Sequence, residues 1–265
     1  MNNLFVKTNL NSISKICLAG LLMALATVLQ KVLAINYIPV VPFLRISLGG
    51  PGVIIFASIF LGPLYGFIVG AGSDILGYFI LDMSGNAFFP QITAIYGLLG
   101  IVPYFIFSLF KRISNKKIMF VVEALGLGAI FIVVTLFVLL NDSMKLYGSV
   151  TEFGIIQKII IPVALFLLLG LVLIFVVFFN KRLEKQEINP VMNAYQISFS
   201  LLIIEILVMV IFGTLMKGWA FGFATYPAIL ICQIITLFIN VPLNTIIISI
   251  LLKLTRKRFI NVGVN

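Results

Sequence analysis

Two ionisable side chains stand out in otherwise apolar stretches of the sequence. Asp74 lies within GAGSDILG, and Arg45 lies within IPVVPFLRISLGG. An intramembrane carboxylate usually faces a wet cavity or a protein interior, where it accepts hydrogen bonds from a ligand, caps a helix or pairs with a basic side chain. A guanidinium pairs through two hydrogen bonds with an incoming carboxylate, or extends into lipid headgroups. Both residues are therefore candidate ligand contacts with a structural alternative.

Aromatic and amide side chains form a second group of candidates. The stretch NAFFPQITAIY contains Phe88, Phe89 and Gln91. Aromatic rings can sandwich a flat heterocycle, and a glutamine supplies a donor and an acceptor. An aromatic belt at the membrane interface is the alternative. Two further aromatic candidates, Phe43 and Tyr78, lie close to the arginine and the aspartate along the chain.

Two spacings on apolar runs indicate helix faces. Asn240 and Asn244 are four residues apart and share a face, where they contact a ligand or form hydrogen bonds between helices. Gly20 and Ala24 have the small-x-x-x-small spacing that lets another helix approach closely. The approaching helix belongs either to this chain or to a separate subunit. Glu205 lies in another apolar run, and the sequence assigns it no role.

The residue inventory argues against several kinds of chemistry. The chain has no histidine, and its two cysteines, Cys17 and Cys232, both lie in apolar runs. We therefore expect no metal site and no disulfide framework. The chain has no phosphate-binding loop motif, no nucleophile elbow and no paired carboxylates, so we expect neither a cofactor nor an enzymatic activity. Energy for uphill transport would come from a partner or an ion gradient.

Composition predicts an all-α polytopic membrane protein. Hydrophobic residues make up 62% of the 265 residues and charged residues only 10%, whereas soluble domains are about one quarter charged. The net charge of +10 is carried largely by short tracts between apolar runs. Such tracts are typical of cytoplasmic loops that contact membrane lipids, and this placement argues against a nucleic-acid partner.

The block from 49 to 81 decides the number of spans. As one helix it would be about 50 Å long, well beyond the hydrocarbon core of a bilayer. A turn at Gly62-Pro63 gives about eight spans with cytoplasmic termini and leaves all but five of the 18 Lys and Arg on cytoplasmic segments. A single span would move the basic tracts outside, against the positive-inside bias. We therefore predict the turn. Its first arm, 49–61, is too short to cross as a straight helix, which favours a site-lining segment over a merely tilted pair.

The stretch FLRISLGGPGVIIFASIFLGPLYGFIVGAGSDILGYFI, together with NAFFPQITAIYGLLG, resembles the S components of energy-coupling factor (ECF) transporters. Within that group it most resembles the folate-specific branch. The resemblance covers about residues 13–112 and resumes weakly near INVPLNTIII. S components generally have six helices, so we expect a single transmembrane domain over 1–265. It would comprise four family-like spans (13–117), an inserted hairpin (118–182) and the last two spans (195–258).

The resemblance implies a vitamin-binding subunit of the bacterial plasma membrane. Such a subunit binds its cargo near the outer face and associates with a transmembrane coupling subunit and two cytoplasmic ATPase subunits. By analogy, Gly20 and Ala24 would meet the coupling subunit, and Arg45 would bind the glutamate tail of folate. The outer-face aromatics would hold rings, and Asp74 would lie near the pterin.

Three alternatives stay open at this point. The same architecture could carry thiamine, riboflavin or another vitamin, because flat aromatic vitamins make similar demands on a site. A self-sufficient secondary transporter would need coupling-ion ligands and usually shows inverted repeats, of which the sequence has little. A membrane scaffold would explain the hydrophobicity but not the convergence of an arginine, aromatics and an aspartate on the outer half.

Overall fold

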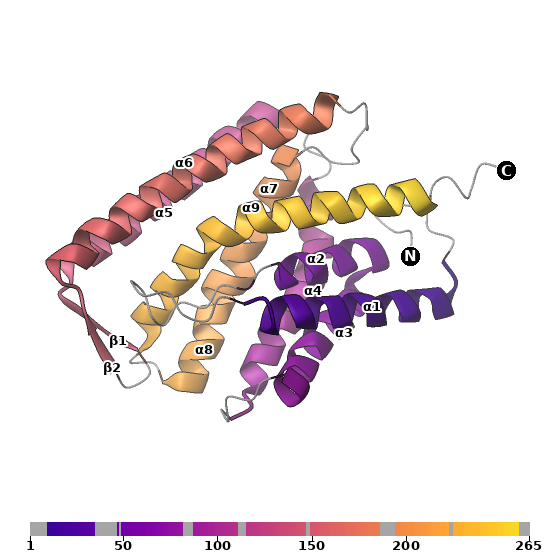
Figure 1. Ribbon diagram of the computed structural model, residues 1–265, viewed down its shortest axis with the longest axis horizontal. Helices are drawn as coiled ribbons and strands as arrows, with labels where there is room; N and C mark the ends of the chain where they lie inside the picture. Colours follow the sequence, from indigo (N-terminus) through magenta and orange to yellow (C-terminus); the bar gives the residue numbers. More distant parts are fainter. Residues whose placement is uncertain are drawn as a thin grey trace. The chain divides into compact units, whose positions relative to one another are not determined.

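The computed structural model describes residues 10–34, 47, 49–81, 87–110, 115–146, 149–185, 194–222 and 225–259 (Figure 1). The regular secondary structure in these ranges is helical apart from one short β-hairpin. The elements in chain order are α1 (Ser12–Lys31), α2 (Gly50–Leu61), α3 (Pro63–Leu76), the π-helix η1 (Gly77–Leu81), α4 (Pro90–Phe110), α5 (Lys116–Leu140), β1 (Ser143–Leu146), β2 (Ser149–Glu152), α6 (Ile155–Lys185), α7 (Ala194–Ile204), the π-helix η2 (Glu205–Phe212), α8 (Gly213–Phe221) and α9 (Tyr226–Phe259).

Seven helical segments within the described ranges are long and apolar enough to cross a membrane, and α2 is a shorter apolar helix. The prediction of an all-α membrane protein with about eight membrane helices is therefore confirmed. The β-hairpin between α5 and α6 was not predicted.

The chain divides into two compact units, which are described separately here. Unit 1 comprises Met1–Ala34, Ser47–Ser114 and Leu243–Asn265, and unit 2 comprises Ile35–Ile46 and Asn115–Pro242. The helix α9 begins in unit 2 and ends in unit 1. That the α5–α6 hairpin is an insertion into a six-helix core stays a prediction.

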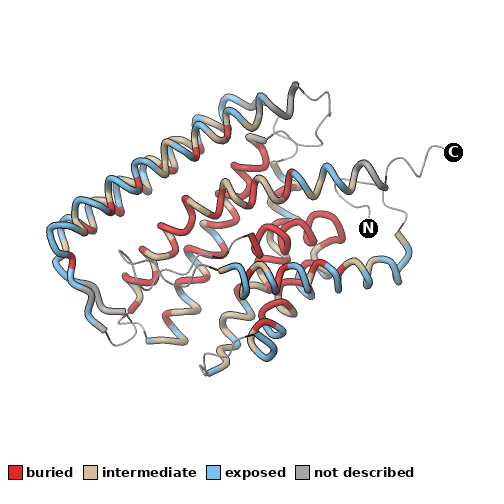
Figure 2. Tube along the Cα trace, in the orientation of Figure 1, coloured by how far each residue is buried: buried red, intermediate tan, exposed pale blue. Residues whose placement is uncertain are grey.

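The short helix α2 forms the core of unit 1. All twelve of its residues are buried (Figure 2), and it packs against α1, α3 and α4. Its length is about 18 Å, compared with about 30 Å for the hydrocarbon core. A helix that is hydrophobic all round is stable only when other elements enclose it, as they do here.

The break between α2 and α3 lies where the charge pattern predicts it. The helix α2 ends at Leu61, Gly62 has φ +103°, and α3 starts at Pro63. A left-handed φ favours glycine, and proline is well suited to the first position of a helix. The predicted turn at Gly62-Pro63 is confirmed.

The helices α3 and α4 pack with their backbones in direct contact. A methyl group added at Gly66 would overlap the carbonyl oxygen of Gly100, and one added at Gly100 would overlap that of Gly66. One turn further along, a methyl group at Gly70 would overlap the carbonyl oxygen of Tyr96. Small residues permit this close approach in membranes, and they fix the register of the two helices.

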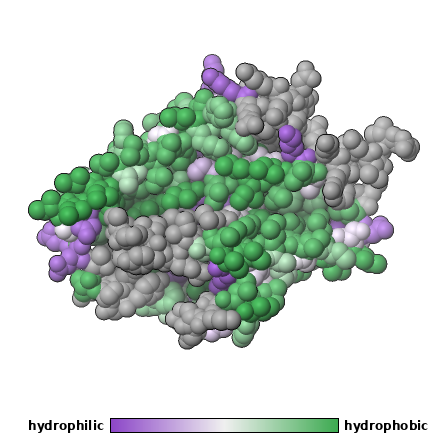
Figure 3. Space-filling model, viewed as in Figure 1, coloured by the Kyte–Doolittle hydropathy of each residue, from purple (hydrophilic) through white to green (hydrophobic). Residues whose placement is uncertain are grey.

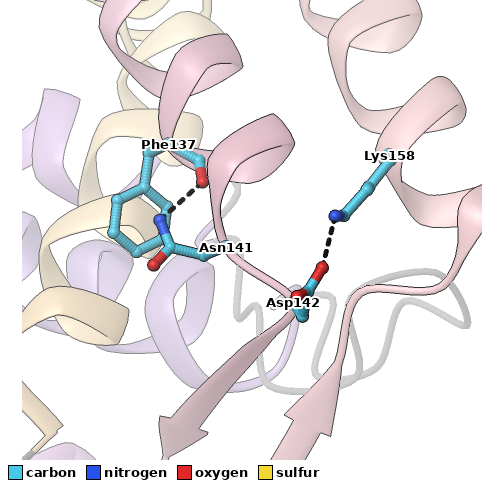
Figure 4. A network of polar contacts seen from close by, with 4 residues as sticks. All are labelled: Phe137, Asn141, Asp142 and Lys158. Atoms are coloured by element: carbon cyan, nitrogen blue, oxygen red, sulfur yellow. Dashed lines mark hydrogen bonds and ion pairs between the residues drawn. The ribbon is translucent and has the colours of Figure 1, made fainter.

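The helices α5 and α6 of unit 2 form a long hairpin. The strands β1 and β2 pair antiparallel between them, with Ser143 opposite Glu152. At the base of the strands, Asp142 accepts a hydrogen bond of 2.6 Å from Nζ of Lys158 (Figure 4). Large apolar side chains are exposed along both helices, and Figure 3 shows hydrophobic residues dominating this surface. Such faces are suited to lipid contact.

Candidate functional site

Asp74 joins α3 to α4. Its side chain is 4% exposed, and its Oδ2 atom accepts a hydrogen bond of 2.7 Å from Oγ1 of Thr93. The glycine contacts between the two helices place Thr93 within reach of the carboxylate. From the sequence, the structural alternatives for Asp74 were that it caps a helix or pairs with a basic side chain. The structure shows a hydrogen bond from the hydroxyl of Thr93. Contact between Asp74 and a ligand stays a prediction.

An aromatic cluster follows Asp74 immediately. The π-helix η1 widens the last turn of the third span, and π-helical turns occur frequently at functional sites. Tyr78 and Phe79 on η1 meet Phe88, with ring centroids 5.1 Å and 5.6 Å from that of Phe88. Phe79 is 70% exposed. The predicted candidates Tyr78 and Phe88 therefore touch each other, and Phe79 is an additional member that the sequence analysis missed.

Gln91 and Phe89 lie at the beginning of α4. The Oε1 atom of Gln91 is buried and has no hydrogen-bond partner in the described part of the chain. The backbone carbonyl of Phe89 accepts a hydrogen bond from the amide of Ile92, which fixes the first turn of α4. The end of the α3–α4 pair thus presents a carboxylate, an amide and aromatic rings.

The helix α1 supplies polar side chains on the facing side of α3. Oγ1 of Thr27 donates to the carbonyl oxygen of Met23 at 2.8 Å and also lies 3.3 Å from the carbonyl oxygen of Ser73. The stem of Lys31 lies against Gly77. These contacts place α1 beside Asp74 and η1. Thr27 and Thr93 were not predicted as site residues, because both lie in apolar runs where a threonine gives no distinct signal.

The beginning of α2 is flanked by two buried amide side chains of unit 1. Gln30 of α1 is 3% exposed and packs on Gly50. Asn244 of α9 is 1% exposed, and a methyl group added at Gly52 would lie 2.9 Å from its Oδ1 atom. The predicted candidate Asn244 is therefore a buried polar residue in the same unit as Asp74.

Three of the predicted ligand contacts are not among the described residues of unit 1. Phe43 and Arg45 lie outside the described residues. Asn240 belongs to unit 2, where it is 9% exposed. From the predicted set, unit 1 contains Asp74, Tyr78, Phe88, Phe89, Gln91 and Asn244, and we call these six residues the Asp74 group.

The small-residue strip on α1 faces outward from unit 1. Gly20 and Ala24 are exposed, and no atom of the described chain lies within 4 Å of a methyl group added at Gly20. Ala26, on another face of the helix, is fully buried. The described part of unit 1 therefore leaves the strip open to another helix.

The Asp74 group contains polar side chains, but it does not resemble a metal centre. The described residues contain no group of three or more His, Cys, Asp and Glu side chains that could hold a metal ion. The carboxyl group of Asp74 accepts a hydrogen bond from Thr93, and the amide side chains of Gln91 and Asn244 are neutral. Such a set recognises a ligand through hydrogen bonds and ring contacts.

The sequence model of the family described as "ECF-type riboflavin transporter, S component" matches residues 10–174, more than half of the chain. The chain belongs to this family. The S component is thus a vitamin-uptake subunit, and the predicted resemblance is confirmed at the level of the ECF class. The match does not support the folate-specific branch. No curated protein and no solved structure matches the chain.

The matched range bears on the arrangement of the helices. It runs from α1 through α5 and most of α6, and it ends before α7. The match therefore includes the hairpin that the sequence analysis treats as an addition to the family core, without deciding which helices form that core.

Proposed function

We propose that this S component captures riboflavin at the outer face of the bacterial plasma membrane and delivers it to an ATP-driven coupling module. The observation that carries the proposal is the match to the riboflavin family over residues 10–174. The Asp74 group supports it, because a buried acceptor and aromatic rings suit a flat heterocycle with an NH group on its edge.

The character of the polar side chains favours riboflavin over folate. Riboflavin is uncharged, with a ring system and a hydroxylated chain, whereas folate carries two carboxylates in its glutamate tail. Gln30 and Asn244 are buried and Gln91 is half-buried, and all three side chains are neutral, as suits hydroxyl and carbonyl groups. Arg45 is the residue that the resemblance assigns to a glutamate tail, so it distinguishes the two ligands.

The outward strip of α1 is the proposed contact with the transmembrane coupling subunit. Gly20 and Ala24 are exposed on it, and close helix packing requires small residues. The coupling subunit would in turn associate with two cytoplasmic ATPase subunits. This chain would supply the recognition of the vitamin, and the module would supply the energy.

The test is equilibrium binding of riboflavin, folic acid and thiamine to the purified S component in detergent. We expect saturable riboflavin binding without ATP or partners, detected by quenching of flavin fluorescence and checked by calorimetry. Asp74→Asn and Tyr78→Ala should weaken riboflavin binding. Lys158→Met, in the α5–α6 hairpin, is the matched control and should bind as the wild type does.

Three results would each replace part of the proposal. Preferential folate binding that is lost in Arg45→Ala would reassign the cargo and keep the class. Tight thiamine binding would do the same. Uptake by the purified chain in vesicles, driven by an ion gradient with no module present, would make it a secondary transporter.

A further inference from the structure

Glu123 of α5 is an acidic residue buried in unit 2. Its side chain is fully buried, and its Oε1 atom accepts a hydrogen bond of 2.5 Å from Oγ of Ser198 on α7. The Oε2 atom is also buried and has no hydrogen-bond partner in the described part of the chain. The carboxyl group lies within the candidate span Lys117–Leu140. The riboflavin site does not use this residue.

The helices α5 and α7 run side by side in parallel around this carboxyl group. One turn before it, the rings of Phe120 and Tyr195 lie 5.4 Å apart. One turn after it, a methyl group added at Gly126 would lie 3.9 Å from Cδ2 of Leu202. Glu123 and Ser198 are the polar pair between these two contacts, and we call the whole set the α5–α7 seam.

The third helix packed on the seam is α6, which contacts both α5 and α7. It runs antiparallel to α5, since Asp142 pairs with Lys158 and the rings of Phe131 and Phe166 lie 6.0 Å apart. Continuing this register places the apolar stretch around Val176, which is 1% exposed, at the level of Glu123.

Tyr195 is the titratable residue nearest to the carboxyl group, because it lies one turn before Ser198 with its ring on Phe120. The other titratable groups lie further away along their helices. Lys158 pairs with Asp142 at the opposite end of the hairpin. Glu205 follows Ser198 by seven residues, which is a rise of about 10 Å. The described Lys181 is exposed, as is Lys117 at the beginning of α5. The remaining titratable residues on α5, α6 and α7 are Lys116, Arg182, Glu184 and Lys185.

We propose that Glu123 and Ser198 form a buried proton-binding site between α5 and α7. An isolated carboxylate is strongly disfavoured in an apolar interior unless it is paired, and the seam provides one neutral hydroxyl donor. With a proton on Oε2 the group is neutral, and Oε1 retains the hydrogen bond from Ser198. The proton comes from water and returns to water, so no other reactant is required.

Loss of this proton would weaken the α5–α7 seam. The carboxylate would then be buried with a single hydroxyl partner, and the α5–α6 hairpin would pack less firmly on α7. The seam is therefore stable at neutral pH and loosens when the pH is raised far enough to remove the proton. The direction is opposite to that of an ion pair, which acid disrupts.

Infrared spectroscopy of the whole S component in lipid vesicles tests the proposal directly. A protonated carboxyl group has a carbonyl stretch separate from that of a carboxylate. We expect a protonated component at neutral pH in the wild type that is lost in Glu123→Gln. Glu152→Gln, which changes an exposed carboxyl group on β2, is the matched control and should retain it.

Thermal unfolding across the alkaline range provides a second readout. Glu123→Gln should have a higher unfolding midpoint than the wild type at alkaline pH, and the difference should shrink toward neutral pH. A wild-type spectrum at neutral pH that matches that of Glu123→Gln in the protonated region would overturn the proposal. So would identical pH profiles for the two proteins. Riboflavin binding by Glu123→Gln, measured separately, keeps this result distinct from that of the binding test.

Discussion

Thr93 of α4 donates a hydrogen bond of 2.7 Å to Oδ2 of Asp74 on α3, where the carboxylate is 4% exposed. This bond fixes the orientation of an acid in the third span of a transporter subunit. A side chain held in this way loses little further conformational entropy when it binds a ligand. The bond thus connects the stability of unit 1 with the recognition proposed for Asp74.

Replacing Thr93 by valine tests this connection. The change keeps the shape of the side chain but removes the donor, and a typical hydrogen bond contributes about 0.5–1.5 kcal/mol to stability. We expect a lower unfolding midpoint in detergent together with weaker riboflavin binding, and Thr93→Ser should restore much of both. Thr255→Val is the control, because within the described part of the chain Thr255 bonds only to carbonyl groups of its own helix. An unchanged midpoint in Thr93→Val would contradict the structural role.

The glycine contacts between α3 and α4 give a sharper prediction for stability. Gly66→Ala or Gly100→Ala forces a methyl group into a backbone carbonyl of the other helix, and overpacking typically costs about 1–3 kcal/mol. We expect a clear decrease in the unfolding midpoint. Gly128→Ala on α5 meets open space, so it should be neutral or stabilising. Equal effects of the three substitutions would argue against close packing of α3 and α4.

The strip on α1 is tested by adding bulk. Gly20→Leu and Ala24→Leu should abolish co-purification with the coupling subunit, because a leucine holds the two helices apart. Riboflavin binding by the isolated S component should persist, since the strip faces away from the packed side of unit 1. The control is Gly128→Leu, which adds the same side chain at an open position on α5. If the double variant still co-purified with the coupling subunit, the strip on α1 would not be the contact surface for that subunit.

The Asp142–Lys158 pair predicts that the stability of the hairpin depends weakly on pH in the acidic range. The hydrogen bond from Lys158, followed by its positive charge, lowers the pKa of Asp142 below its ordinary value of 3.8. The pair therefore stabilises the hairpin at pH values above 3.8. This contribution to stability is lost as the pH falls through the lowered pKa of Asp142. Because Asp142 is 94% exposed, we expect Lys158→Met to change the unfolding midpoint little at neutral pH. In that variant the pKa of Asp142, followed by NMR, should return toward its ordinary value; a pKa that stayed low would assign the shift to another cause.

Much of the helix pattern could be predicted because the membrane imposes strong rules on the sequence. The positive-inside bias required a turn near Gly62, and the structure has α2 ending at Leu61. Hydropathy located the hairpin at 118–182, and α5 and α6 span Lys116–Leu140 and Ile155–Lys185. The π-helix η1 was not predictable, because one extra residue in a turn leaves no trace in an apolar run.

The site was less predictable, because it depends on contacts between helices. Asp74 was identified from its charge, but its partner Thr93 is nineteen residues away and becomes a neighbour only through the packing of α3 and α4. Glu123 was overlooked although a glutamate in an apolar run is itself a signal. Side chains that act through neighbours on other helices require the fold before they can be assigned.

The burial of α2 has a consequence for the biogenesis of the protein. A helix of about 18 Å does not span a bilayer, so it cannot be stably inserted by itself during synthesis. It has to enter together with α3 as one helical hairpin, and it becomes enclosed only once α4 has been made. The most apolar helix of unit 1 is therefore made before α3 and α4, which enclose it, and we expect the first four helices to insert cooperatively.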